Sequence, residues 1–339
     1  MKDSCKLEFY DGLTGFVIIC VIVLMSQDLT AAQEDISTGF SFITTHDNYS
    51  IRYGVWQCGK KERRGSIIIL SGRTEFMEKY AETIGELNQR DFDVYSFDWR
   101  GQGLSTRMLP NRHKGFVQSY DNYIKDLDLF ITKIVKPTAT PPLIILAHSM
   151  GGHITLRFLQ DYPDVIDCAV LLSPMIDICT SPLPGWFVRS FAGFAVKIGL
   201  DKGYVIGSDD YPFGGKRFEG NRLTSDPERF MDEKKAIFEN SDLALGGVTY
   251  GWLARTYDSI EIINESGYAE RIKTPVLIIG AELDEIVCID AEEAFCSFLT
   301  NCRFRVIADS RHEILKETDI IRSLFWNEFD KFIGISKAK

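Results

Sequence analysis

Short, almost wholly apolar runs rich in β-branched residues recur along this chain, and they constrain its fold more than any other feature. The clearest of them are Ser66–Leu70, Pro142–Ala147 and Val276–Ile279. Such runs are typical of strands that are covered on both faces. Segments with helical periodicity lie between them, for example Tyr120–Val135. This alternation predicts an α/β protein with a mostly parallel central sheet flanked by helices.

The other elements fit the same scheme. A turn signal at residues 46–48 separates two expected N-terminal strands. The other predicted strands are Phe40–Thr44, Tyr49–Cys58, Phe92–Phe97, Cys168–Leu172 and Phe304–Ala308, and the other predicted helices are Tyr80–Arg90, Gly152–Tyr162 and Asp319–Ile333. Parallel α/β sheets bind ligands beyond the carboxyl ends of their strands, so the functional residues are expected there.

One long segment interrupts the alternation. Residues 176–262 contain no convincing apolar strand, but they contain a helical stretch at Trp186–Ile198 and two more helical stretches further on. The segment is too long to be a loop of a compact domain. We therefore predict a core made of residues 36–175 and 263–337, with residues 176–262 inserted as a mainly helical cap.

The first 32 residues differ from the rest. Leu13–Met25 is a nearly unbroken apolar run, shorter than the roughly 20 residues of a transmembrane helix. It fits a signal peptide with a cleavage site near Thr30-Ala31-Ala32, although acidic residues flank it where a signal is usually basic. Residues 1–32 are thus predicted to be a signal peptide or an N-terminal membrane anchor, and a buried leader or a misplaced start is the alternative. An exported (periplasmic or secreted) or membrane-associated protein is favoured over a cytoplasmic one.

The charge and the cysteine content argue against nucleic-acid binding and against a zinc or redox site. The net charge is −10, so the sequence shows no sign of the basic surface that binds nucleic acid. The eight cysteines include no C-x-x-C pair, which argues against a zinc or redox site. Cys296 and Cys302 flank a short turn, and they form either a disulfide or a pair of buried free thiols.

The strongest chemical signal is the stretch Leu146–Gly152, which contains Ser149 and joins an apolar strand to a helix. This is the context of the nucleophile elbow G-x-S-x-G, a sharp turn that needs small neighbours. Ala147 replaces the first glycine of the motif, and Gly151 keeps the second. Ser149 is therefore the candidate nucleophile, and an ordinary Ser-Gly helix start is the structural alternative.

A base and an orienting acid are found further along the chain. His312 follows the last predicted strand, where the histidine belongs in the chain order serine, acid, histidine. Asp284 lies in the loop after the strand Val276–Ile279 and is the preferred acid, with Glu282 and Glu285 as rivals.

Two backbone amides are expected to stabilise an oxyanion. One is that of Met150, directly after the nucleophile, and the other is that of Arg73, in the turn after the strand Ser66–Leu70. A second turn, Asp98–Ser105, follows another strand. We interpret it as structural, with Arg100 holding neighbouring loops.

Together these residues resemble the bacterial lysophospholipase and monoacylglycerol lipase group of α/β-hydrolases, within the serine aminopeptidase-like hydrolases. The resemblance spans roughly residues 38–335. The stretches that resemble the whole group are Ala147–Gly152, Asp98–Ser105, Glu282–Val287 and Arg311–Leu315. The stretches that resemble the lysophospholipase branch in particular are Ser71–Arg73 with Glu75 and Lys79-Tyr80, His113–Val117 and Asn221–Phe230. Related lipases carry His-Gly where this chain has Ser71-Gly72, which puts the substrate detail in doubt.

The resemblance implies an α/β-hydrolase fold whose cap covers the active site. The cap aromatic residues would form either an aromatic roof over the site or, for most of them, a small core of the cap itself. They are Trp186, Phe187, Phe191, Phe194, Tyr204, Tyr211, Phe213, Tyr250 and Trp252.

The sequence thus predicts a serine esterase or lipase that cleaves single-acyl lipids, lysophospholipid or monoacylglycerol, through an acyl-enzyme. This chemistry requires no metal and no organic cofactor. The expected partner is a lipid-like substrate, with association at a membrane surface. The alternatives are a serine peptidase or broad carboxylesterase of the same fold, and a non-catalytic binding protein. A peptidase would need cap acids to hold the substrate amine, and Asp209, Asp210, Glu219, Asp232 and Glu233 are interpreted as solvated charges instead. The oligomeric state stays open.

Overall fold

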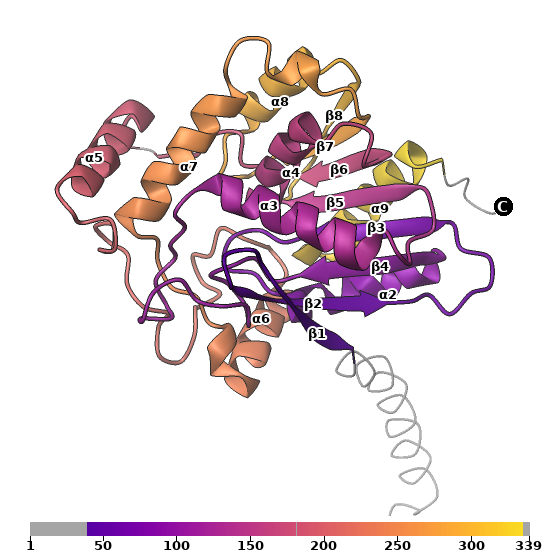
Figure 1. Cartoon of the computed structure of the whole chain (residues 1–339), viewed down its shortest axis with the longest axis horizontal. Coiled ribbons are helices and arrows are strands. Elements are labelled where there is room, and N and C mark those ends of the chain that lie inside the picture. Colours follow the sequence, from indigo (N-terminus) through magenta and orange to yellow (C-terminus); the bar gives the residue numbers. More distant parts are fainter. Residues whose placement is uncertain (1–38, 181, 335–339) are drawn as a thin grey trace, which may run out of the picture. The chain divides into compact units, whose positions relative to one another are not determined.

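The computed structural model describes residues 39–180 and 182–334, whose centre is one eight-stranded sheet (Figure 1). The strand order is β1-β2-β4-β3-β5-β6-β7-β8. The pairs β1–β2 and β2–β4 are antiparallel, and the other neighbours are parallel, as predicted. The strands are β1 (Phe40–Thr44), β2 (Ser50–Trp56), β3 (Gly65–Leu70), β4 (Phe92–Phe97), β5 (Leu143–His148), β6 (Cys168–Leu172), β7 (Val276–Ala281) and β8 (Cys302–Ile307).

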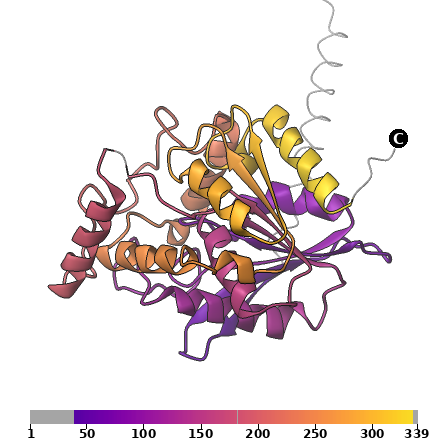
Figure 2. The ribbon, with the colours of Figure 1, turned by 90° about the horizontal axis from the view of Figure 1, so that it is seen from above.

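Helices cover both faces of this sheet (Figure 2). One face packs against α3, α4 and α8, and the other packs against α2 and α9. The helices are α2 (Ala81–Gln89), α3 (Tyr120–Phe130), α4 (Met150–Asp161), α5 (Gly185–Lys197), α6 (Pro227–Glu239), α7 (Tyr250–Ile263), α8 (Ile289–Phe298) and α9 (Asp319–Phe332).

Strand β3 shows why the central strands read as continuous apolar runs. Its side chains point alternately to the two faces. Ile68 and Leu70 belong to the core on the α3 and α4 side, whereas Ile67 and Ile69 belong to the core on the α2 and α9 side. All four are fully buried, because helices cover both faces.

The segment between β6 and β7 contributes the helices α5, α6 and α7. Helix α5 packs on α7 through a small apolar cluster that includes Ala192, Ala195 and Leu253. Helix α7 also reaches the main core, because Trp252 and Ile263 belong to it. The inserted helices therefore share part of their packing with the sheet domain.

Several sequence predictions differ from the structure in detail. The helix predicted at residues 120–135 is α-helical to Phe130 and ends in a π-helical turn, Ile131–Val135. Helix α8 was not predicted. Its apolar and acidic residues follow the acid loop without a clear start signal, since Cys288 at its N-cap provides no side-chain hydrogen bond. Cys296 and Cys302 form a disulfide between α8 and β8.

The aromatic residues of the cap are largely exposed. Tyr250 and Trp252 are buried. The exposed ones are Trp186, Phe187, Phe191, Phe194 and Phe213. For these five, the expectation of a cap core is wrong. In α5, the buried contact with α7 is made mainly by Ala192 and Ala195, and Phe191 touches Tyr250 while staying 42% exposed.

The leader predictions concern residues 1–32, which lie outside the described residues. Among the residues that are described, no helix combines the length and the apolar character needed to cross a bilayer.

Candidate active site

Ser149 lies in a sharp turn between the end of β5 and the start of α4. Its backbone has φ 52° and ψ −114°, a strained conformation for a residue other than glycine. A Cβ at Gly151 would lie 2.5 Å from the carbonyl oxygen of Leu70 and 2.7 Å from that of Ser71. Glycine is therefore required there, because backbone atoms cannot give way as a flexible side chain would.

The structure brings Ser149, His312 and Asp284 into one chain of hydrogen bonds. The distance from Ser149 Oγ to His312 Nε2 is 3.0 Å, and the distance from His312 Nδ1 to Asp284 Oδ2 is 2.7 Å. The serine, the imidazole and the carboxylate are all almost completely buried. They come from the ends of β5, β8 and β7, which meet at the same edge of the sheet.

The backbone of its own loop fixes Asp284. Its Oδ1 accepts the amides of Ile286 and Val287 at 2.8 and 3.0 Å, which leaves Oδ2 for His312. Burial raises the pKa of Asp284, but the contact with His312 and these amides outweighs burial and lowers it. The rival acids Glu282 and Glu285 are exposed, and Glu282 accepts the amide of Asp309.

The turn after β3 lies against the nucleophile. A Cβ at Gly72 would lie 3.3 Å from Ser149 Cβ, and the Gly72 amide donates to the Glu75 carboxylate. Among the described residues, the backbone amides of Arg73 and Met150 have no hydrogen-bond acceptor. These are the two amides that the sequence assigned to an oxyanion.

His148 and Glu75 form a second polar pair directly behind the site. His148 Nδ1 lies 3.0 Å from Glu75 Oε2, and His148 Nε2 lies 3.1 Å from the carbonyl oxygen of His312. Both partners are acceptors, so both ring nitrogens donate and the imidazole is charged. Burial lowers the pKa of His148, but Glu75 outweighs burial and raises it. The pair thus connects three segments: the turn after β3 that contains Gly72 and Arg73 (the oxyanion turn), the elbow around Ser149, and the loop after β8 that contains His312 (the His312 loop).

Sequence reasoning gave neither residue a role. His148 lies within the elbow stretch, and Glu75 belongs only to the stretches that carry the resemblance. The sequence signal for the pair is a carboxylate two residues after Arg73, together with a histidine directly before Ser149.

This pair predicts pH-dependent stability. Because the folded state raises the pKa of His148, the pair stabilises fully below pH ~6.5 and loses its effect as the pH rises through the folded-state pKa. We expect His148→Gln to lower the free energy of unfolding by about 1.5–3 kcal/mol at pH 6, and by less as the pH approaches 9. Urea unfolding at several pH values measures this difference. His46→Gln, at an exposed hairpin residue, is the control, and a His148 difference that grows with pH would contradict the prediction.

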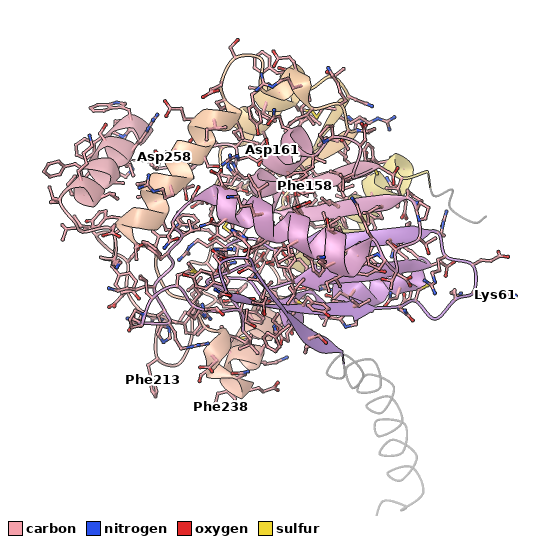
Figure 3. The ribbon with its side chains drawn as sticks, viewed as in Figure 1. Lys61, Phe158, Asp161, Phe213, Phe238 and Asp258 are labelled. Carbon is pink, nitrogen blue, oxygen red and sulfur yellow. A yellow bond between two sulfur atoms is a disulfide. The ribbon has the colours of Figure 1, made fainter. Side chains whose placement is uncertain are left out.

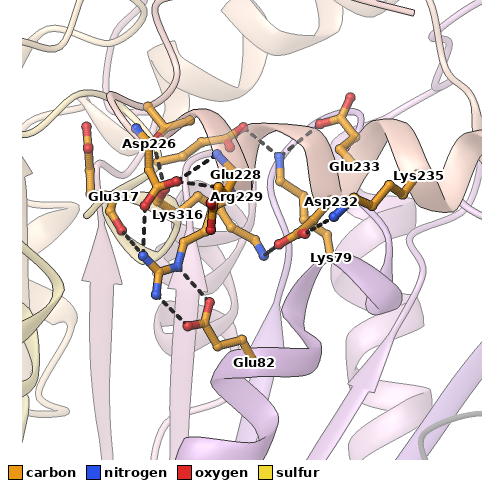
Figure 4. A network of polar contacts seen from close by, with 12 residues as sticks. Lys79, Glu82, Asp226, Glu228, Arg229, Asp232, Glu233, Lys235, Lys316 and Glu317 are labelled. Atoms are coloured by element: carbon orange, nitrogen blue, oxygen red, sulfur yellow. Dashed lines mark hydrogen bonds and ion pairs between the residues drawn. The ribbon is translucent and has the colours of Figure 1, made fainter. Parts of the chain in front are cut away.

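Ion pairs join the inserted helix α6 to the core beside the site (Figure 4). The buried Lys79 ammonium lies 2.6 Å from Glu313 Oε1, and it lies 3.1 Å from both Glu75 Oε1 and Glu233 Oε2. Glu233 is therefore buried and paired, so its interpretation as a solvated charge is wrong. The position of the His312 loop depends on this cluster, because Glu313 is the next residue.

The turn Asp98–Ser105 is structural, as interpreted from the sequence. Arg100 is completely buried and pairs with Asp126 and Asp47 at 2.6 and 2.8 Å. Asp98 accepts the amides of Met77 and Leu104 and pairs with Arg52. These contacts hold the N-terminal strands against the oxyanion turn.

Comparisons with known proteins match most of the chain. A family model described as serine aminopeptidase, S33, matches residues 61–319. Lysophospholipase L2 of Escherichia coli is 32% identical over 266 residues, which are 76% of this chain and 77% of that protein. Probable lysophospholipase L2 of Haemophilus influenzae is 29% identical and covers 80% of this chain and 84% of its own length.

The solved structures agree with the sheet topology. A soluble variant of monoglyceride lipase from Saccharomyces cerevisiae superposes with a TM-score of 0.69 at 20% identity, over 88% of this chain and 96% of that one. Monoacylglycerol lipase from Paleococcus ferrophilus gives a TM-score of 0.65 at 20% identity, over 84% and 99%. The α/β-hydrolase fold predicted from the sequence is thereby confirmed.

Proposed function

Because the chain belongs to the serine aminopeptidase (S33) family of α/β-hydrolases, we propose that it is a serine esterase that hydrolyses carboxylic esters of single-acyl lipids. The observation that carries this proposal is the unbroken contact from Ser149 through His312 to Asp284 at the carboxyl edge of the sheet. A non-catalytic protein of this fold would not need all three residues in hydrogen-bonding positions.

The geometry supports acyl transfer in two steps. Ser149 Oγ attacks the ester carbonyl, and His312 Nε2 takes its proton. The amides of Arg73 and Met150 stabilise the oxyanion, and His312 returns the proton to the leaving alcohol. Water, activated by His312, then releases the fatty acid, while Asp284 orients the imidazole and stabilises its charged form.

The relatives favour a lysophospholipid as substrate. Two curated relatives that this chain matches over three quarters of its length are named lysophospholipase L2 or probable lysophospholipase L2. Monoacylglycerol is the second candidate, because the two similar solved structures described above are named monoglyceride lipase and monoacylglycerol lipase.

The peptidase alternative is weaker, because two of the cap acids, Glu233 and Asp210, already have partners. Glu233 pairs with Lys79 and Lys216. Asp210 accepts from Tyr204 and Asn111. A substrate amine would have to displace these contacts before it could bind.

Fatty-acid release tests the proposal. Lysophosphatidylcholine, monoacylglycerol and an aminoacyl arylamide should be compared as substrates of the full chain. We expect release from the lipids and none from the amide. Release only from the amide would overturn the ester assignment in favour of a peptidase.

We further propose that α5 docks on the lipid surface that holds the substrate. Phe187, Phe191, Phe194 and Ile198 follow one another at helical spacing and form an exposed apolar stripe, the α5 stripe. The opposite side of α5 packs on α7, and Phe191 also touches the Tyr250 ring, with 5.8 Å between the ring centres, but each of the four stripe residues is at least 42% exposed. Trp186, 71% exposed, extends it, and tryptophan favours membrane interfaces.

Substitution of this surface should weaken binding to membranes. We expect Trp186→Ser with Phe194→Ser to reduce partition onto phosphatidylcholine vesicles about 100-fold, because two aromatic side chains no longer leave water. Vesicle sedimentation measures this, and hydrolysis of a soluble short-chain ester should stay unchanged.

Phe213→Ser with Phe238→Ser is the matched control. Both residues are highly exposed, and they lie by α6, away from α5 (Figure 3). An equal loss of vesicle binding in both double variants would contradict a specific role of α5.

We also propose that the chain is exported. The apolar run at Leu13–Met25 supports it, as does the disulfide Cys296–Cys302, since such bonds persist in oxidising compartments. N-terminal sequencing of the protein from membrane, soluble and culture-medium fractions would distinguish a cleaved signal from an anchor.

A further inference from the structure

Arg73 is a cation without a carboxylate partner among the described residues. Its Nη2 donates to the carbonyl oxygen of Gly246 at 2.5 Å, and its Nε is buried without an acceptor. The guanidinium also lies 5.3 Å from the centre of the Trp252 ring. Buried Arg52 and Arg100, by contrast, each pair with two carboxylates. The charge of Arg73 is therefore not balanced by any carboxylate of residues 39–180 and 182–334.

The surroundings of this guanidinium keep the charge in place. Burial lowers the pKa of Arg73 to about 10, so the group is still protonated at neutral pH. The ionisable side chains acting on it are the phenols of Tyr120, Tyr123 and Tyr204, and burial raises the pKa of each of them. Neutral phenols cannot compensate a cation. A buried cation without an anion is costly, which favours binding of an anion from outside.

The guanidinium lies between the nucleophile and the inserted helices. Gly72, the preceding residue, lies against Ser149, while Gly246 precedes α7 and Trp252 lies in its first turn. Gly115 leaves space beside it, since a Cβ there would lie 3.0 Å from Arg73 Nη2. Because the backbone amide of Arg73 is assigned to the oxyanion, its side chain starts within a few bonds of the groups next to the scissile ester.

We propose that the Arg73 guanidinium binds the phosphate of a lysophospholipid while the ester lies over Ser149. This inference rests on the proposed esterase function and names the head group. In a lysophospholipid only the glycerol carbons and their oxygens separate the ester from the phosphate. The planar guanidinium suits bidentate contact with phosphate oxygens. A monoacylglycerol offers only neutral hydroxyls at this place, so Arg73 would discriminate against it.

Arg73→Met and Arg73→Lys test this proposal through the ratio of two activities. For Arg73→Met we expect the ratio of kcat/KM for lysophosphatidylcholine to kcat/KM for monoacylglycerol to fall about 30-fold, whatever loss the two substrates share through the oxyanion turn. Arg73→Lys should recover part of the loss, because it keeps the charge without the bidentate geometry. Arg112→Met is the matched control, since Arg112 is an exposed arginine paired with Asp242 and should leave the ratio unchanged. Equal losses on both lipids would overturn the proposal and leave Arg73 as a support of the oxyanion turn.

A binding measurement separates this proposal from the esterase assignment. Glycerophosphocholine carries the phosphate but no acyl ester, and its titration into wild type and Arg73→Met can be followed by calorimetry. Binding that depends on Arg73 would support the phosphate site even if neither lipid were hydrolysed. Equal binding to both proteins, or no binding to either, would overturn it. Binding of inorganic phosphate but not of glycerophosphocholine would overturn the head-group assignment.

Discussion

Ser149→Ala is expected to lower kcat for lysophosphatidylcholine by roughly 10⁴- to 10⁶-fold. The substitution removes only Oγ, the atom that lies 3.0 Å from His312 Nε2. Without it no acyl-enzyme can form, and only the oxyanion amides and substrate binding remain. The fold should survive, because alanine is no larger than serine in the tight turn at φ 52°. Fatty-acid release measures the loss.

The same variant distinguishes the mechanism from chemistry elsewhere on the chain. A fluorophosphonate should label wild type and fail to label Ser149→Ala. Ser323→Ala, at an exposed serine of α9, is the matched control and should retain both labelling and activity. Activity that persists in Ser149→Ala would contradict the serine mechanism.

Asp284→Asn is expected to lower kcat about 10³- to 10⁴-fold at neutral pH. In wild type Oδ1 accepts two loop amides and Oδ2 accepts His312 Nδ1. An asparagine would keep its oxygen on the amides and turn its NH₂ toward His312. Nδ1 would then have to accept a hydrogen bond, the ring proton would move to Nε2, and the imidazole could no longer take the Ser149 proton. Steady-state kinetics measure the loss.

The neighbouring acids provide the controls for this second prediction. Glu282→Gln and Glu285→Gln change exposed side chains in the same loop, and both should keep kcat within about threefold of wild type. A large loss in either variant, with Asp284→Asn remaining active, would mean that the orienting acid was chosen wrongly.

Much of the sheet domain follows from local patterns in the sequence. Apolar runs such as Ser66–Leu70 become central strands whichever helices cover them, because a strand buried on both faces needs apolar side chains throughout. The elbow is equally local: a serine between a strand and a helix, with glycine where backbone atoms come close, predicts the turn around Ser149.

Other features could not be predicted because their partners are distant in sequence. Glu233 lies 154 residues after Lys79 in the chain. The contact between the two therefore depends on how α6 packs on the core. The α5 stripe reads in sequence like any apolar helix face, and only the packing on α7 shows which side remains exposed.

The sequence by itself determined the α/β layering, the elbow and the order of serine, acid and histidine, since each of these depends on residue types at fixed local spacing. The tertiary structure alone decided that Asp284, and not Glu282 or Glu285, contacts His312, because the choice depends on which carboxylate the loop amides hold. It alone placed His148 against Glu75 and showed that no carboxylate of the described residues pairs with Arg73. Charge balance is a property of neighbours in space, and in this fold those neighbours come from segments far apart in the chain.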